Sequence, residues 1–311
     1  MTNIIETEEL TKYYGFLFWK RNEPALSRLT IKIPEGSVFG FLGPNGAGKT
    51  TTIKLVMDLI RPTEGSVKVF GRSPDDMEVK KMLGFLPDCP AFSSYLSAYD
   101  FLNICAKLLK IPPSERRKKI YEVLCIVKME KHAKSKVGGF SRGMIQRIGI
   151  AQAILNNPKL LVLDEPLVGL DPHGRQDLKD IITSQKDKGT TVFFSSHILS
   201  DVEKICDRIG ILNKGILLCS GRIDELLSVT GIRAHINPGR DEIAKELMEH
   251  ASGTIKLPNG GWELVFQNNN QAESLINSAL EKSPGAIAIT PTRESLEEFF
   301  FRKVENSSGI Q

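Results

Sequence analysis

A glycine-rich stretch, GPNGAGKT at residues 43–50, carries the clearest chemical pattern in this sequence. It fits the spacing G-x-x-x-x-G-K-[ST], in which glycines let backbone N–H groups surround phosphate oxygens. In this pattern Lys49 reaches the outer phosphates of a nucleotide and the hydroxyl of Thr50 binds Mg²⁺. The residues predicted to bind the nucleotide are Gly43, Pro44, Asn45, Gly46, Ala47, Gly48, Lys49, Thr50 and Thr51.

Two adjacent carboxylates follow an apolar run farther along the chain. Leu160–Leu163 is continuously apolar, as is typical of a buried strand in a parallel sheet, and Asp164 and Glu165 come directly after it. Open α/β sheets bind their ligands at the carboxyl ends of the strands. We therefore predict that Asp164 holds Mg²⁺ and that Glu165 polarises an attacking water.

A histidine follows a third apolar run. Thr191–Phe194 predicts another buried strand, and His197 comes after two serines at its end. A single histidine often has only a structural role. This one is expected at the same sheet edge as Lys49 and Asp164, which favours a contact with the γ-phosphate or the catalytic water.

The stretch GGFSRGMIQRI, residues 138–148, predicts a helix that begins beside two glycines. Ser141 is a natural N-cap, because its hydroxyl can accept from the free N–H groups of the first turn. Such a helix start can bind an anion. The sequence leaves two alternatives open for Arg142, which either faces that anion or points to solvent.

Strands and helices must alternate for these residues to meet. Val38–Leu42 predicts a strand before the glycine-rich loop, and residues 51–57 predict a helix after it. With the strands that precede Asp164 and His197, this order predicts an α/β fold built on a parallel sheet.

Composition limits the other possibilities. The 311 residues suffice for two domains, and 41% hydrophobic and 25% charged residues are ordinary for a globular protein. A net charge of +4 is too weak to predict a nucleic-acid partner, and we expect none. No apolar run has the length of a membrane span, and the first residues lack the pattern of a signal peptide. The five cysteines lack metal-binding spacing, which predicts reduced thiols.

In this order, the motifs resemble those of an ATP-binding cassette (ABC) ATPase over about residues 4–225. Residues 43–50 resemble the Walker A loop, and residues 160–165 resemble Walker B with its catalytic glutamate. Residues 169–172, GLDP, match the D-loop, and His197 matches the switch histidine. The resemblance implies a P-loop NTPase fold that uses ATP and Mg²⁺.

The resemblance also assigns roles at three further places. Tyr14 corresponds to the aromatic residue that stacks on adenine, with Tyr13 as the alternative, and Asp171 is the D-loop aspartate. Residues 140–144 resemble the signature Leu-Ser-Gly-Gly-Gln, which in this family contacts the γ-phosphate held by a second cassette. The signature residues in trans would be Ser141, Arg142, Gly143 and Met144, with arginine replacing a glycine and methionine replacing the glutamine.

A second departure from the family pattern is Asp88, which stands where the family has the Q-loop glutamine. An aspartate there can still ligate Mg²⁺ through oxygen, although it adds negative charge near the triphosphate. Acidic residues here and a Phe-Ser-Arg-Gly-Met signature resemble the type-2 exporter branch. Residues from about 88 to 155 then resemble the helical subdomain that contacts the membrane subunits.

Two segments lie outside the common core. Phe16, Phe18 and Trp19 stand beside Lys20 and Arg21, and this insertion is either a hairpin tip packed on its own domain or an amphipathic tip that touches a partner or lipid. Residues 226–311 predict helices, a hairpin around Asn259-Gly260-Gly261 and a final strand and helix. We predict an ABC ATPase domain at 1–225 and a small α+β accessory domain at 226–311.

The sequence therefore predicts the ATP-hydrolysing subunit of an ABC exporter. The expected partners are an integral-membrane permease and a second cassette, in a homodimer or heterodimer, at the cytoplasmic face of the membrane. One alternative is an ABC ATPase that acts on ribosomes or DNA, although this chain has one phosphate loop and no heptad array. The other alternative is a module that senses ATP without hydrolysing it.

Overall fold

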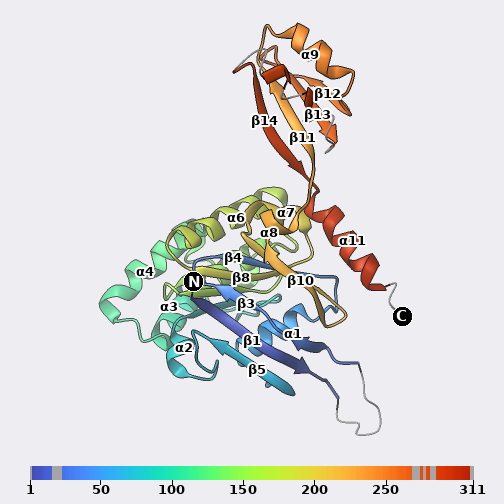
Figure 1. Cartoon of the computed structure of the whole chain (residues 1–311). Coiled ribbons are helices and arrows are strands. Elements are labelled where there is room, and N and C mark those ends of the chain that lie inside the picture. The colour runs from blue at the N-terminus through green and yellow to red at the C-terminus, as the bar shows by residue number, and fades with distance from the viewer. Residues whose placement is uncertain (1, 16–22, 268–273, 276–277, 281–284, 309–311) are drawn as a thin grey trace. The chain divides into compact units, whose positions relative to one another are not determined.

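The computed structural model describes residues 2–15, 23–267, 274–275, 278–280 and 285–308. Its contacts divide the chain into two compact units, Met1–Ile223 with Lys303–Gln311, and Asp224–Arg302 (Figure 1). The aromatic insertion at residues 16–21 lies outside the described residues. Among the described helices, none has the length and apolar character needed to cross a membrane.

A six-stranded sheet forms the centre of the first unit, in the order β10-β9-β4-β8-β7-β6. Five of its strands are parallel, and β10 pairs antiparallel at one edge. The strands are β4 (Val38–Leu42), β6 (Leu83–Leu86), β7 (Leu160–Leu163), β8 (Thr191–Ser196), β9 (Arg208–Asn213) and β10 (Ile216–Arg222). The predicted α/β fold with a parallel sheet is confirmed, and the predicted strand from Thr191 continues through Ser196.

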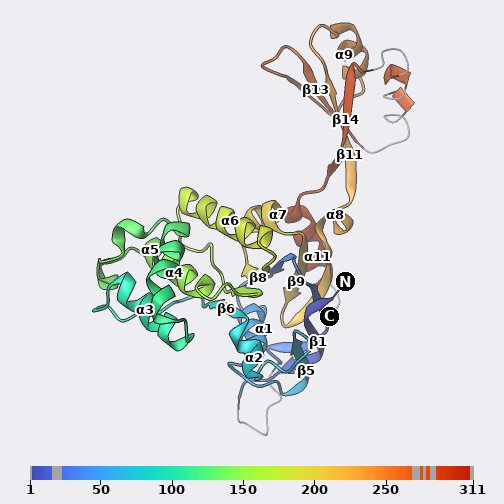
Figure 2. The same cartoon turned by 90° about the vertical axis from the view of Figure 1, so that its left-hand side faces the viewer.

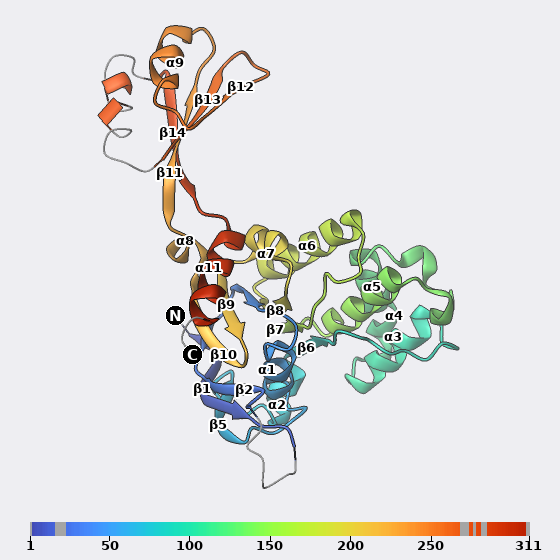
Figure 3. The ribbon, with the colours of Figure 1, turned by 90° about the vertical axis from the view of Figure 1, so that its right-hand side faces the viewer.

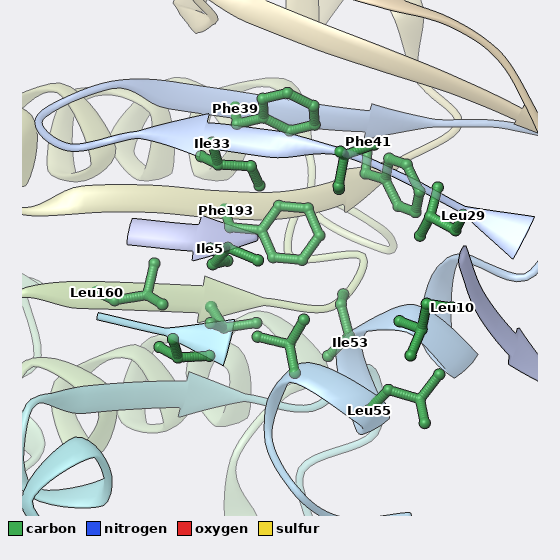
Figure 4. Packing of buried hydrophobic residues seen from close by; sticks show 14 of the residues in the cluster. Ile5, Leu10, Leu29, Ile33, Phe39, Phe41, Ile53, Leu55, Leu160 and Phe193 are labelled. Carbon is green, nitrogen blue, oxygen red and sulfur yellow. The ribbon is translucent and has the colours of Figure 1, made fainter. Parts of the chain in front are cut away.

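A second, antiparallel sheet covers one face of this unit. In it β1 (Asn3–Lys12) pairs with β2 (Leu26–Leu29), β3 (Lys32–Pro34) and β5 (Glu64–Val69). The hydrophobic core contains side chains of both sheets and of helix α1 (Lys49–Val56) (Figure 4). The ring of Phe193 lies 5.9 Å from that of Phe39 and 5.7 Å from that of Phe41, measured between ring centroids. Burial of these rings fixes the strand that leads into the glycine-rich loop.

Helices complete the first unit. Those between β6 and β7 pack on one another and lie together beside β6 (Figures 2 and 3). They are α3 (Ala98–Leu108), α4 (Pro113–Ile126), the short 3₁₀ turns η1 (Glu130–His132) and η2 (Val137–Gly139), and α5 (Arg142–Ile154). The other helices of this unit are α2 (Met77–Lys81), α6 (Pro172–Asp187) and α7 (Leu199–Ile205). Helices α3, α4 and α5 thus lie between β6 and β7 in the sequence, although β6 and β7 are paired neighbours in the sheet.

The second unit is an α+β fold, as predicted. Its sheet has the order β12-β13-β11-β14, with antiparallel pairing throughout, and helix α9 packs on one face. Its elements are β11 (Val229–Ile236), α9 (Asp241–Met248), β12 (Gly253–Lys256), β13 (Trp262–Gln267) and β14 (Ile287–Arg293). Because β13 lies between β11 and β12, the two strands that α9 connects, the sheet has the split β-α-β arrangement.

Two short segments join the units. Helix α8 (Ile223–Leu226) lies at the first change of unit, and helix α11 (Leu296–Ser308) spans the second. By contacts, the chain from Lys303 onward belongs with the first unit. The domain boundary between residues 225 and 226 stays a prediction.

Candidate active site

The glycine-rich loop connects β4 to α1. Gly48 caps α1 with a φ of 105°, a left-handed conformation that suits glycine, and a β-carbon there would lie 2.6 Å from the carbonyl oxygen of Ala25. No described side chain caps this helix start. Its first backbone N–H groups are therefore available to an anion, as the sequence predicts.

Lys49 is buried at the base of this loop, with only 5% of the residue exposed. Its ammonium group donates to the carbonyl oxygens of Gly43 and Pro44, at 2.7 Å and 3.2 Å. It also forms an ion pair with Glu165, 3.0 Å from Oε1. Two carbonyls and one carboxylate thus satisfy a buried cation, which would otherwise be costly.

Asp164 is bound by two hydroxyl groups. Ser195 Oγ donates to its Oδ1 at 2.7 Å and Thr50 Oγ1 donates to the same oxygen at 3.2 Å. Burial, with 3% of the residue exposed, raises the pKa of this carboxyl, and the two hydroxyl groups partly oppose that shift. The arrangement places a carboxylate and a hydroxyl, both oxygen donors, beside the phosphate loop.

Glu165 connects the two halves of the site. Its Oε1 meets Lys49, and its Oε2 lies 3.0 Å from Nδ1 of His197. Its backbone N–H donates to Ser195 Oγ at 2.8 Å, and its φ of 47° is left-handed. A non-glycine residue in this conformation is strained, and such strain concentrates at functional sites. The carboxylate is 12% exposed and the imidazole 44% exposed, so the pair borders solvent.

A cavity lies over the loop. Glu165 and Asp88 share its lining with residues of the loop and of the first turn of α1. The lining residues are Ala25, Asn45, Gly46, Ala47, Gly48, Lys49, Thr50, Thr51, Asp88 and Glu165. The structure therefore brings Asp88 to the predicted phosphate site.

Two tyrosines precede the loop in sequence, and they differ in their contacts. The hydroxyl of Tyr14 lies 3.5 Å from Thr51 Oγ1, and the ammonium of Lys12 lies 5.7 Å from its ring centroid. Tyr13 instead uses its backbone N–H to donate to Thr63 Oγ1. Tyr14 is thus the tyrosine whose side chain reaches a lining residue of the cavity.

The segment Ser141–Met144 starts α5. Ser141 is the N-cap, accepting from the backbone N–H of Met144 at 3.3 Å. None of these four described residues lines the cavity over the loop of the same chain. Arg142 instead lies against Gly169. Asp171, from the predicted D-loop, is the N-cap of α6 and accepts from the N–H of Gly174 at 2.9 Å.

Sequence reasoning missed Ser195 and Gln146. Ser195 bonds to both Asp164 and Glu165, and the amide of Gln146 donates to the carbonyl oxygen of Pro166 at 3.1 Å. A serine that ends a buried apolar strand was a usable signal. Gln146 gave no such signal, because it lies inside a helix and not at the end of a strand.

Comparisons with known proteins show which proteins this chain is similar to. Residues 26–168 match the family model described as ABC transporter. An ABC transporter ATP-binding protein of Nostoc sp. is 39% identical, over 97% of this chain and 90% of its own length. The bacitracin transport ATP-binding protein BcrA of Bacillus licheniformis is 35% identical, over 98% of each chain. The solved dimeric structure of MJ0796, a bacterial ABC transporter cassette, is 26% identical with a TM-score of 0.64, covering 70% of this chain and 98% of that one.

Proposed function

The chain belongs to the ABC transporter family of ATP-binding proteins, and we propose that Glu165 and His197 carry out ATP hydrolysis over the loop 43–51. As a member of this family, it is an ABC ATPase and the ATP-binding subunit of a transporter. The observation that carries the assignment is the position of Glu165, whose single carboxylate meets both Lys49 and His197.

ATP would bind with its phosphates on the backbone N–H groups of residues 45–51. Lys49 would exchange its contact with Glu165 for the β- and γ-phosphates, since a triphosphate brings more negative charge than one carboxylate. Tyr14 would stack on the adenine, because its hydroxyl already lies beside Thr51 at the rim of the cavity.

Mg²⁺ fits the oxygen donors at the base of the cavity. Thr50 and Asp164 would hold it, and the bound ion would neutralise charge on the β- and γ-phosphates. Ser195 would keep Asp164 oriented through the hydroxyl contact. Asp88 lines the same cavity and would act as a third oxygen ligand.

Hydrolysis requires a base for the attacking water and a group that stabilises the γ-phosphoryl group as it passes from ADP to that water. Glu165, freed from Lys49, would accept a proton from the attacking water. His197 would contact the γ-phosphate, and its present contact with Glu165 keeps the two side chains together. In the transition state, positive groups around the γ-phosphate would lower the barrier.

A second cassette would complete the site. Ser141 and Gly143 lie at a helix start, where N–H groups and the helix dipole favour a phosphate. Since these residues do not line the cavity of their own chain, they would serve the ATP held by a partner cassette. ATP binding would thereby drive dimerisation.

The work of transport would lie in a separate membrane subunit. We place the chain at the cytoplasmic face of the membrane, bound to a permease through the helical segment at 88–155. The Phe-Ser-Arg-Gly-Met signature supports an exporter. We also propose that residues 226–311 form an accessory domain of this subunit.

The first experiment tests the chemistry. Glu165→Gln should lower steady-state ATPase activity by about 100-fold or more, because it removes the base, while ATP binding is retained. Unchanged hydrolysis by this variant would sink the assignment of Glu165.

The second experiment tests the partner. The tagged chain would be captured from gently solubilised native membranes, and the co-purifying proteins identified by mass spectrometry. We expect a polytopic membrane protein in stoichiometric amount. Recovery of ribosomal proteins or DNA-bound partners instead would favour the alternative of an ABC ATPase without a permease.

A further inference from the structure

The first turn of α5 packs on the loop that follows β7 in the same chain. Gly169 in that loop has a φ of 74°, and the side chain of Arg142 fills the space beside its α-carbon. A β-carbon built on Gly169 would lie 2.6 Å from Nε, 2.8 Å from Cζ and 2.9 Å from Cδ of Arg142. Such distances are far below van der Waals contact. Arg142 is exposed, as one of the two alternatives from the sequence has it, and the end of its side chain also lies against Gly169.

Two further side chains of α5 hold the same segment. Gln146, with 4% of the residue exposed, donates to the carbonyl oxygen of Pro166 at 3.1 Å. Arg147 donates to Asp177 on α6 at 2.6 Å. The first half of helix α5 thus contacts the segment 166–177 at Pro166, Gly169 and Asp177.

This segment is directly joined to Glu165. Pro166, whose carbonyl accepts from Gln146, is the next residue in the chain. The backbone of Glu165 is held on its other side by the contact between its N–H and Ser195 Oγ. A shift of residues 166–169 relative to α5 would therefore turn the peptide that orients the Glu165 carboxylate.

We propose that Arg142 is a positioning residue that holds residues 166–171 on α5, so that Ser141 and Glu165 of one chain move together. The inference rests on the proposed function, in which Ser141 contacts the ATP of the partner cassette and Glu165 serves the ATP of its own. Arg142 then couples the two ATP sites of a dimer. A glycine at this position, as in the signature that the motif resembles, has no side chain to make this contact.

Kinetics test the coupling. Arg142→Ala keeps the helix start but removes the contact, and Arg142→Lys keeps the stem and the charge. Arg61→Ala is the matched control, since the side chain of Arg61 is 78% exposed and its ion pair with Asp75 spans 3.8 Å. In full-length chains, Arg142→Ala should lower kcat for ATP about fivefold, leave KM within about twofold and bring the Hill coefficient toward 1. Arg142→Lys should recover part of kcat, and Arg61→Ala should match the wild type.

A double-mutant cycle tests the contact itself, without any need for hydrolysis. Gly169→Ala should lower Tm, because its β-carbon meets Arg142 and its left-handed backbone is strained. In the Arg142→Ala background the same change should lower Tm by less, since only the strain remains.

The outcomes separate the inference from the function that it rests on. An equal loss of Tm from Gly169→Ala in both backgrounds would overturn the contact. A normal kcat and Hill coefficient in Arg142→Ala would overturn the coupling. If the wild-type chain hydrolyses no ATP, the proposed function fails, and the cycle still decides whether Arg142 holds the loop.

Discussion

At the scale of single residues, hydroxyl groups organise the carboxylates of the site. Ser195 donates to Asp164 and accepts from the N–H of Glu165, so one side chain orients two adjacent residues. Asp164 is nearly fully buried, where an unpartnered carboxylate would be strongly disfavoured. The strand β8 therefore contributes to the site through Ser195, as well as by leading into His197, which follows the strand.

We predict that Ser195→Ala lowers both stability and activity. The change leaves the N–H of Glu165 without its acceptor and Asp164 with only one of its two hydroxyl donors, that of Thr50, which should cost about 1–3 kcal/mol of unfolding free energy. ATPase activity should fall about tenfold, because Glu165 loses its orientation. Thr190→Ala is the control, since Thr190 makes a comparable buried contact, to Pro158, near the other end of β8. A loss of activity as large in the control would contradict a specific role for Ser195.

Lys49 gives a second prediction at this scale. Lys49→Ala should weaken ATP binding by about 10- to 100-fold, the usual effect of removing a charged hydrogen-bond partner. Binding of a fluorescent ATP analogue measures it directly. Lys54→Ala, an exposed lysine on the same helix, should bind as the wild type does. Retained affinity in Lys49→Ala would refute the role of the loop.

At the scale of elements, ion pairs join α5, α6 and the segment that follows α4. The side-chain nitrogens of Lys128 and Arg147 each donate to a carboxylate oxygen of Asp177 on α6, at 2.6 Å. Both contacts stabilise the ionised carboxylate and so lower the pKa of Asp177 below its ordinary 3.8. The contact with Lys128 is the larger cause, and the contact with Arg147 comes next. The cations from two different segments thereby fix the helix that follows the D-loop.

The lowered pKa sets the pH dependence of this link. A carboxyl with a depressed pKa in the folded state contributes stability above pH 3.8, and this contribution is lost as the pH falls further through the folded-state value. Asp177→Asn should therefore destabilise the chain at pH 7 by about 1 kcal/mol, and the difference from the wild type should shrink below pH 3.8.

Denaturant unfolding at several pH values measures this difference. Asp180→Asn is the control on the same helix, because Asp180 receives a hydrogen bond from Gln176. A difference between Asp177→Asn and wild type that is the same at pH 7 and at pH 3 would argue against the ion pairs as its source.

At the scale of the whole molecule, each chain holds only part of the proposed ATP site. The phosphate loop, Asp164, Glu165 and His197 meet at one sheet edge, whereas Ser141 and Gly143 start a helix away from that cavity. In the proposed function, the remaining phosphate contacts come from a second chain. Two parts of one sequence would thus serve two different sites.

We predict that ATP and Mg²⁺ convert the Glu165→Gln variant into a stable dimer, because bound ATP is not hydrolysed. Size-exclusion chromatography with light scattering should give twice the 34.5 kDa mass of one chain. Adding Ser141→Arg, which blocks the helix start, should leave a monomer that still binds ATP. Dimers of the same mass without nucleotide would show that ATP is not what joins the chains.

The sequence by itself determined the local parts of this protein. The loop at 43–50, strands β4 and β7 and the helix start at Ser141 follow from contiguous residues, since apolar runs, glycine conformations and N-caps act over a few residues. The edge of the sheet where Asp164 and His197 lie followed from the same patterns, because parallel strands end on one side.

Only the tertiary structure decided the contacts between distant segments. Ser195 with Asp164, Glu165 with both Lys49 and His197, and Arg142 with Gly169 join residues that are 27 or more positions apart in the printed sequence. The same holds for the last helix, which begins in one unit and ends in the other. Which side chains meet across such separations depends on how helices and sheets pack, and the pattern of any one segment does not contain that information.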